Sequence, residues 1–110
     1  MIEDTIAKIE ARIQSADPIQ EDKLRELQNL LATLKAEVAA LSQTNVEQAR
    51  SISGFTDLST HEAIRKDKNP TLLTLSLKGM STSVEGFEAS HPKLVQVVNS
   101  ISNYLANMGI

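Results

Sequence analysis

Two side chains near the end of the chain have the residue types for acid–base chemistry, Glu88 and His91. They belong to the most distinctive string in the sequence, Phe87-Glu88-Ala89-Ser90-His91-Pro92. A carboxylate and an imidazole can move protons to and from a substrate, but triad chemistry needs a third group that the sequence does not supply. We therefore interpret the string as a corner between two helices. Phe87 anchors the first helix, Ser90 or His91 caps the second, and Pro92 sets its first turn.

The second histidine begins a pattern that is similar to a zinc-protease motif. His61 and Glu62 open it correctly, but Arg65 occupies the position of the second histidine. Most metal sites need three or four ligands, and the absence of cysteine excludes thiolate ligands and disulfides. We therefore expect no metal, no cofactor and no catalytic residue, and we predict that the protein is not an enzyme.

Composition narrows the possible partners. The net charge is −3 with both signs interspersed, and there are only three aromatic residues. The one basic cluster, Arg65, Lys66 and Lys68, is interrupted by Asp67, so we expect no nucleic-acid partner. No stretch approaches the ~20 apolar residues of a membrane span. The first residues are acidic, unlike a signal peptide, so we expect a cytoplasmic protein.

Heptad spacing predicts a helical hairpin over residues 1–42. Isoleucines at 2, 6, 9 and 13 predict a helix over 2–16, and Asp17-Pro18 ends it and starts the next, over 18–42. That second helix has the strongest period in the chain. Its apolar positions are Leu24, Leu27, Leu31, Leu34, Val38 and Leu41. The two helices should run antiparallel around a tight turn.

Residues 43–69 keep no steady apolar period. The spacing of Thr44 and Glu47 is that of a capping box, although the second helix could also run on through it. Gly54 should break the helix, and Ser59 with Glu62 resembles a second helix start. We therefore expect an irregular or short-helical connecting segment.

A second hairpin is predicted over residues 70–110, with helices at 70–89 and 92–108. Asn69-Pro70 starts the first helix. Alternation at Leu73, Leu75 and Leu77 also fits a strand, but a helical period continues for twice that length as far as Phe87. We therefore favour a helix. At the end of the chain, Gly109 should adopt left-handed geometry and Ile110 should pack back as a hydrophobic latch.

A stripe of small residues accompanies the apolar seam of the helix predicted at 70–89. Its members are Ser76, Gly79, Ser83, Gly86 and Ser90. Glycine inside a helix costs up to ~1 kcal/mol relative to alanine. Either another helix approaches this stripe closely, such as the last one through Val97 and Tyr104 or a partner chain, or the stripe is a loose exposed face. Both interpretations remain open from the sequence.

The corner at 87–92 and the terminal string Asn107-Met108-Gly109-Ile110 resemble a small bacterial family known as domain of unknown function 4404. The resemblance covers residues 70–110 most specifically and extends to residues 1–42, and it leaves out 43–69. It implies a bacterial cytoplasmic origin and no activity.

The predicted fold is therefore all-α, a four-helix bundle built from two helical hairpins, forming one domain over residues 1–110. The predicted function is a non-enzymatic helical interaction or scaffold module that self-associates as a homo-oligomer and binds an unidentified protein partner. The alternative is a small regulatory ligand-binding protein with a site near the His91 corner. The candidate interaction or structural residues are Phe87, Glu88, Ser90, His91, Pro92, Gly109 and Ile110.

Overall fold

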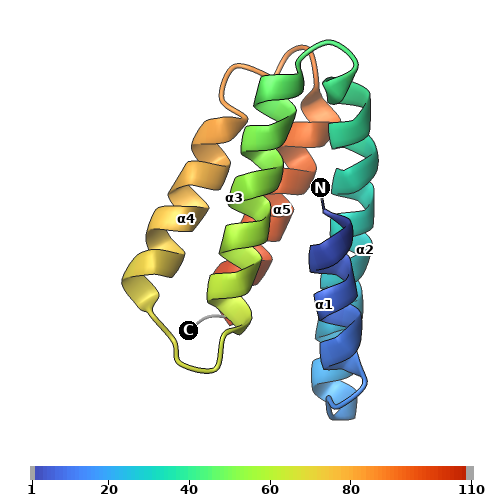
Figure 1. The fold of residues 1–110 in the computed structure, drawn as a ribbon, viewed down its shortest axis with the longest axis vertical. Coiled ribbons are helices and arrows are strands. Elements are labelled where there is room, and N and C mark those ends of the chain that lie inside the picture. The colour runs from blue at the N-terminus through green and yellow to red at the C-terminus, as the bar shows by residue number, and fades with distance from the viewer. Residues whose placement is uncertain (1, 109–110) are drawn as a thin grey trace.

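The computed structural model describes residues 2–108 and is helical throughout. Over these residues it contains no strand, which confirms the all-α prediction (Figure 1). The helices are α1 (Glu3–Ile13), α2 (Pro18–Ser42), α3 (Val46–Ile64), α4 (Pro70–Ser83) and α5 (Pro92–Met108). The described part of the chain therefore has five helices, where four main ones were expected.

Side-chain caps fix where α2 and α4 begin. The carboxylate of Asp17 accepts a hydrogen bond from the Gln20 amide at 2.8 Å, and Asn69 accepts one from the Leu72 amide at 3.1 Å. In both cases proline follows the cap in the first helical turn. These caps satisfy amide groups that have no partner within their own helix. The predicted starts at residues 18 and 70 are confirmed.

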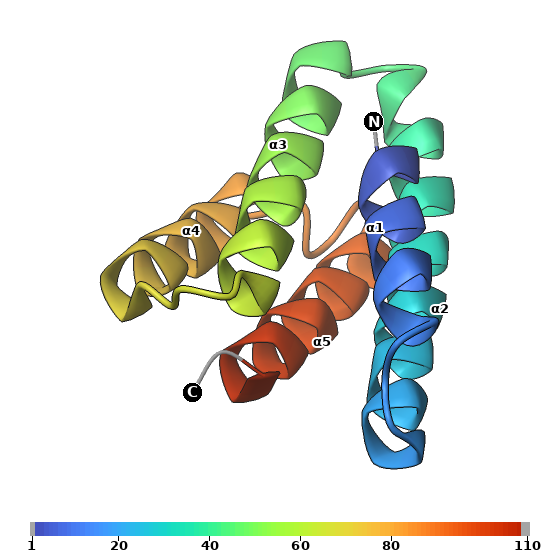
Figure 2. The same cartoon turned by 60° about the horizontal axis from the view of Figure 1, so that its bottom comes forward.

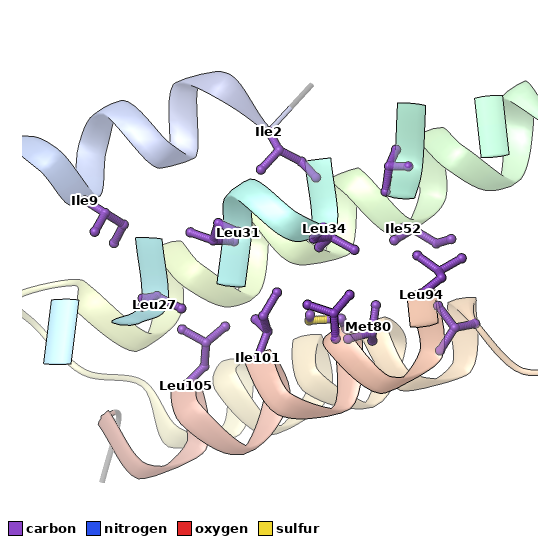
Figure 3. Packing of buried hydrophobic residues seen from close by; sticks show 14 of the residues in the cluster. Ile2, Ile9, Leu27, Leu31, Leu34, Ile52, Met80, Leu94, Ile101 and Leu105 are labelled. Carbon is purple, nitrogen blue, oxygen red and sulfur yellow. The ribbon is translucent and has the colours of Figure 1, made fainter. Parts of the chain in front are cut away.

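The α1–α2 hairpin supplies about half of the buried hydrophobic residues. All six seam residues of α2 are buried, as are Ile2, Ile9 and Ile13 beside them. Contacts from Glu10 to Gln28 and from Glu3 to Lys35 show that the two helices run antiparallel. Figure 3 shows leucines of α2 lying between α1 and α5. One hydrophobic cluster includes residues from all five helices.

The connecting segment is where the structure differs most from the prediction. Residues 46–64 form one helix of 19 residues, so irregular or short-helical structure there is wrong. Its cap is Asn45, whose side chain accepts a hydrogen bond from the Gln48 amide at 3.2 Å. Gly54 continues the helix, and Ser59 is buried in its interior instead of starting another. The buried side of α3 is made largely of small polar residues, so no apolar period marks it.

Helix α4 ends at Ser83, six residues before the predicted end at 89. Gly86 has a φ of 91°, in the left-handed region that side chains disfavour. The chain therefore turns away before Phe87, which lies in the connection to α5. Helix α5 begins at Pro92, as predicted.

The helices are arranged with α1 at one side of the molecule and α4 at the other (Figure 2). α1 packs mainly against α2, while α3 contacts α2, α4 and α5. The α3–α4 pair is antiparallel, because Gln48 near the start of α3 donates to the main-chain oxygen of Ser83 at the end of α4. No helix within residues 2–108 has both the length and the apolar character needed to cross a membrane.

Candidate functional site

Helix α3 buries four serines and threonines beside its apolar core residues, and it exposes two large apolar side chains. Ser53, Thr56, Ser59 and Thr60 are all buried on its inner side. Thr56 and Thr60 donate to main-chain oxygens one turn earlier, whereas the hydroxyls of Ser53 and Ser59 have no protein partner. Phe55 and Leu58, by contrast, are exposed on the outer side. This is the reverse of the usual distribution, in which large apolar residues lie inside.

Helix α4 continues the exposed apolar strip. The exposed fractions are 37% for Phe55, 46% for Leu58, 43% for Leu72 and 59% for Leu75. Because α3 and α4 are antiparallel and Phe55 lies against Gly79, the next turn of each helix brings Leu58 and Leu75 to the same level. We call these four residues the α3–α4 apolar surface. Only one charged residue, Lys78, occurs in the 14 residues of α4.

The small residues of α4 allow its close approach to α3. A Cβ atom added to Gly79 would lie 2.2 Å from a ring carbon of Phe55. Ser76 and Ser83, on either side of Gly79 along the stripe, are buried. Of the two interpretations of the small-residue stripe, close packing of a helix is therefore correct at these positions. The neighbour at Gly79 is α3 and not α5, and Gly86 and Ser90 lie beyond the end of α4.

The side chains of Glu88 and His91 form their hydrogen bonds within the 87–92 corner or with Gly86, the residue directly before it. The Gly86 amide donates to the carboxylate of Glu88 at 2.9 Å. The His91 ring packs edge-on against Phe87 with 5.6 Å between ring centroids, and its Nδ1 lies 2.9 Å from the Ser90 hydroxyl. The amide of His91 also donates to the main-chain oxygen of Phe87 at 2.8 Å. The polar contacts of Glu88 and His91 are thus made to different neighbours, and they shape the connection between α4 and α5.

The other candidates from the sequence lie elsewhere. Glu62 is only 5% exposed and accepts a hydrogen bond from Arg65 at 2.8 Å, while His61 is exposed at 3.9 Å from it. Within residues 2–108 the acidic and histidine side chains form no group of three suited to a metal ion. Gly109 and Ile110, predicted as a terminal latch, lie outside the described residues.

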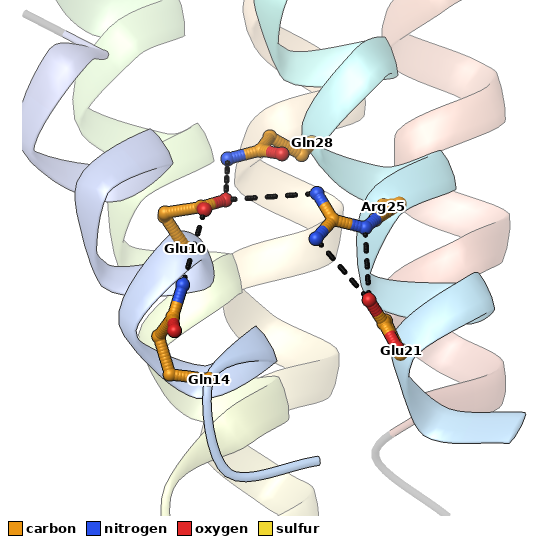
Figure 4. A network of polar contacts seen from close by, with 5 residues as sticks. All are labelled: Glu10, Gln14, Glu21, Arg25 and Gln28. Atoms are coloured by element: carbon orange, nitrogen blue, oxygen red, sulfur yellow. Dashed lines mark hydrogen bonds and ion pairs between the residues drawn. The ribbon is translucent and has the colours of Figure 1, made fainter. Parts of the chain in front are cut away.

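A polar network holds the outer side of the α1–α2 hairpin (Figure 4). Glu10 accepts a hydrogen bond from Gln28 at 2.9 Å, and its carboxylate lies 4.0 Å from Arg25. Arg25 in turn bonds Glu21 at 3.2 Å within α2. Both carboxylates and the guanidinium are about half exposed, so each ion pair contributes at most ~1 kcal/mol. This network orients the hairpin and has no chemical feature of a reactive site.

The surroundings of Asp57 and Lys68 alter the acidity of both side chains. Burial raises the pKa of the Asp57 carboxyl, and a hydrogen bond from the Thr5 hydroxyl at 2.5 Å partly opposes that rise. Burial also lowers the pKa of the Lys68 ammonium, and the nearby Arg12 guanidinium lowers it further. Lys68 and Arg12 belong to a cavity of about 680 Å³ at the ends of α1, α3 and α5. A smaller hollow of about 380 Å³ lies beside Glu88 and Pro92.

Sequence reasoning missed both the α3–α4 apolar surface and the larger cavity. The surface had a detectable signal only on α4, where Leu72 and Leu75 fall outside the predicted apolar seam, because no seam was predicted for the segment that contains Phe55 and Leu58. The cavity had none, since its cations Arg12, Lys23 and Lys68 come from three separate segments.

No curated protein and no solved structure matches the chain. A family described as Domain of unknown function (DUF4404) matches residues 27–110. The match includes residues 43–69, where the resemblance was expected to be absent, and it leaves out α1. Because it covers well over half of the sequence, the chain belongs to the DUF4404 family.

Proposed function

We propose that this protein is a non-enzymatic helical interaction module that self-associates, with the α3–α4 apolar surface of one copy packed against the same surface of a second. The observation that supports this is the reversed arrangement of α3, in which Phe55 and Leu58 face outward while serines and threonines face inward. Contiguous exposed apolar residues on a small protein are typical of interaction sites. A second copy would remove them from water.

The charge of α4 favours a second copy over an unrelated partner. In a two-fold dimer each residue near the axis meets its own counterpart, so like charges would repel across the interface. α4 has a single charged residue, Lys78, among its 14 residues, and its other outward residues include small threonines. Two such helices can approach closely without repulsion. A strongly charged partner would find little complementary charge here.

The wider proposal follows from the sequence. The chain acts as a single helical domain in the bacterial cytoplasm, without a cofactor, and its dimer presents a scaffold for a protein partner. The alternative is a ligand-binding protein with its site near His91. The hollow beside that corner, about 380 Å³, is smaller than the cavity of about 680 Å³ at the opposite end of α5, so this alternative has less structural support near His91.

Sedimentation equilibrium of the full chain from low to high micromolar concentration tests self-association. We expect a concentration-dependent dimer, which Leu75→Lys converts to a monomer with an unchanged helical circular-dichroism spectrum. Ile19→Lys is the matched control, because Ile19 is 72% exposed at the start of α2, away from this surface. A wild-type protein that stays monomeric at every concentration, or an equal loss of dimer in both variants, would contradict the proposal.

A further inference from the structure

The cavity of about 680 Å³ lies where several helix ends meet. Residues from the last turns of α1, α3 and α5 and the first turns of α2 line it. These helix ends lie at the same end of the molecule in Figure 1. None of the residues of the α3–α4 apolar surface lines it. A function of this cavity is therefore independent of the proposed self-association.

Among the described residues, the charged side chains that line the cavity are all positive. They are Arg12, Lys23 and Lys68. A helix C-terminus carries about −0.5 charge and an N-terminus about +0.5. Three C-termini and one N-terminus thus offset about one of the three positive charges. The described lining side chains and helix ends together leave an excess of about two positive charges at the cavity.

The three cations also have hydrogen-bond donors to spare. Arg12 donates to the main-chain oxygen of Ile64, and Lys68 donates to that of Ala63, so both bind the end of α3. A guanidinium has five N–H donors and an ammonium has three, and each of these uses one in this way. Lys23 is exposed, and it makes no hydrogen bond or ion pair within residues 2–108. Burial lowers the pKa of Lys68, and the nearby Arg12 guanidinium lowers it further.

The rest of the lining is partly apolar. Leu24 and Ala63 are buried at the cavity, and Ile64 and Met108 are partly buried beside them. A ligand that matches this lining needs one anionic group and one apolar part. An inorganic ion would leave the apolar lining uncovered, and a hydrocarbon would leave the cations without a counter-charge.

We infer that this cavity binds a small organic anion, with a carboxylate or phosphate head near Arg12, Lys23 and Lys68 and a short apolar body against Leu24, Ile64 and Met108. The two heads share the same recognition chemistry, in which charge-assisted hydrogen bonds form to guanidinium and ammonium groups. A volume of about 680 Å³ falls within the range of small-molecule sites.

Amide NMR titration of the full-length protein tests this inference with four probes: octanoate, octyl phosphate, octyltrimethylammonium and inorganic phosphate. We expect saturable shifts at Arg12, Ile64 and Lys68 with octanoate or octyl phosphate, and the tighter of the two identifies the preferred head. The bound anion should also raise the pKa of Lys68, followed through its side-chain resonances. Equal binding of octyltrimethylammonium, or no saturation with either anion, would overturn the inference.

A charge-removal pair separates a specific site from general attraction. Lys23→Met removes a cavity cation that has no hydrogen bond or ion pair among the described residues, and one lost charge-assisted bond corresponds to about tenfold weaker binding. Lys93→Met removes the same charge at the start of α5, at the far end from the cavity, and should leave affinity unchanged. Equal weakening by both variants, or by neither, would show that the cavity is not the binding site. Self-association is measured separately, so failure here leaves the proposed dimer intact.

Discussion

The α1–α2 and α3–α4 hairpins both bury apolar residues, but the second also buries serines and threonines and leaves several large apolar residues exposed. In α2, six leucine and valine positions at heptad spacing are all buried, and the outer side carries charged residues. In α3 and α4, serines and threonines are buried while Phe55, Leu58, Leu72 and Leu75 are exposed. Apart from Ile19, which is 72% exposed, the first hairpin has no large apolar residue among the exposed ones within residues 2–108. The second leaves apolar surface outside, where another molecule can cover it.

The comparison separates residues that stabilise the fold from those that serve association. Burial of a leucine contributes about 1.5–3 kcal/mol to folding, and an exposed leucine contributes little. A large apolar residue that is exposed on α4 is therefore free to act in binding. The predictions below test whether the two hairpins differ in this way.

The largest expected effect is on the core of the first hairpin. Leu31 is fully buried in α2, and Leu31→Ala should lower the free energy of unfolding by about 2–5 kcal/mol through lost burial and a residual cavity. Leu75→Ala in α4 should change it by no more than about 0.5 kcal/mol in the monomer. Urea unfolding at low protein concentration measures both. Similar losses in the two variants would remove the distinction between the hairpins.

An intermediate effect is expected where α3 and α4 touch. Gly79→Ala should lower the free energy of unfolding by about 1 kcal/mol, because a new Cβ overlaps the Phe55 ring and this outweighs the gain in helix propensity. Gly54→Ala in α3 meets nothing within 4 Å and should raise it by about 1 kcal/mol.

Thermal and urea unfolding of both glycine variants, alone and in a Phe55→Ala background, separate the two causes. Removal of the Phe55 ring should change the sign of the Gly79→Ala effect and leave that of Gly54→Ala as it was. If Gly79→Ala is destabilising even without the ring, the close approach of α4 to α3 at this point is not its cause.

The smallest expected effect is the change with pH in the stability that the Thr5–Asp57 hydrogen bond between α1 and α3 provides. Burial raises the pKa of Asp57 in the folded state, so the fold favours the protonated form and this group's contribution to stability falls as pH rises through that pKa. Asp57→Asn keeps an acceptor for the Thr5 hydroxyl and removes the charge. The stability of the variant relative to the wild type should therefore increase between about pH 3 and pH 7. A constant difference in urea unfolding across this range would contradict the assignment.

The sequence predicts the helices whose buried side is aliphatic. The isoleucines of α1, the leucine seam of α2 and the period of α5 each match a buried face, and Asp17 and Asn69 mark two starts. It does not predict α3 as one helix. Ser53, Thr56 and Thr60 are buried there, and a search for regularly spaced apolar residues does not count polar ones. The early end of α4 depends on the left-handed geometry of Gly86, which competes with an apolar period that continues to Phe87.

The candidate sites were harder to predict than the helices. The residues of the 87–92 corner lie together because they are consecutive, but the orientation of Glu88 toward the Gly86 amide depends on the local turn. The cavity cations are brought together only by tertiary packing, since Arg12 and Lys68 are far apart in the chain. A single sequence contains no signal for such a convergence.

The two hydrogen bonds between α1 and α3 have a consequence for folding during synthesis of the chain. Thr5 bonds Asp57 and Arg12 bonds the oxygen of Ile64, each pair separated by 52 residues, so the helices run parallel and in register. At a synthesis rate of roughly 5–20 residues per second, each partner on α3 is made about 3–10 s after its counterpart on α1. During that interval the nascent α1 has only α2 to pack against. The leucine seam of α2 and the Glu10–Gln28 bond are thus the contacts that can hold the emerging amino-terminal helix in place until the rest of the protein follows.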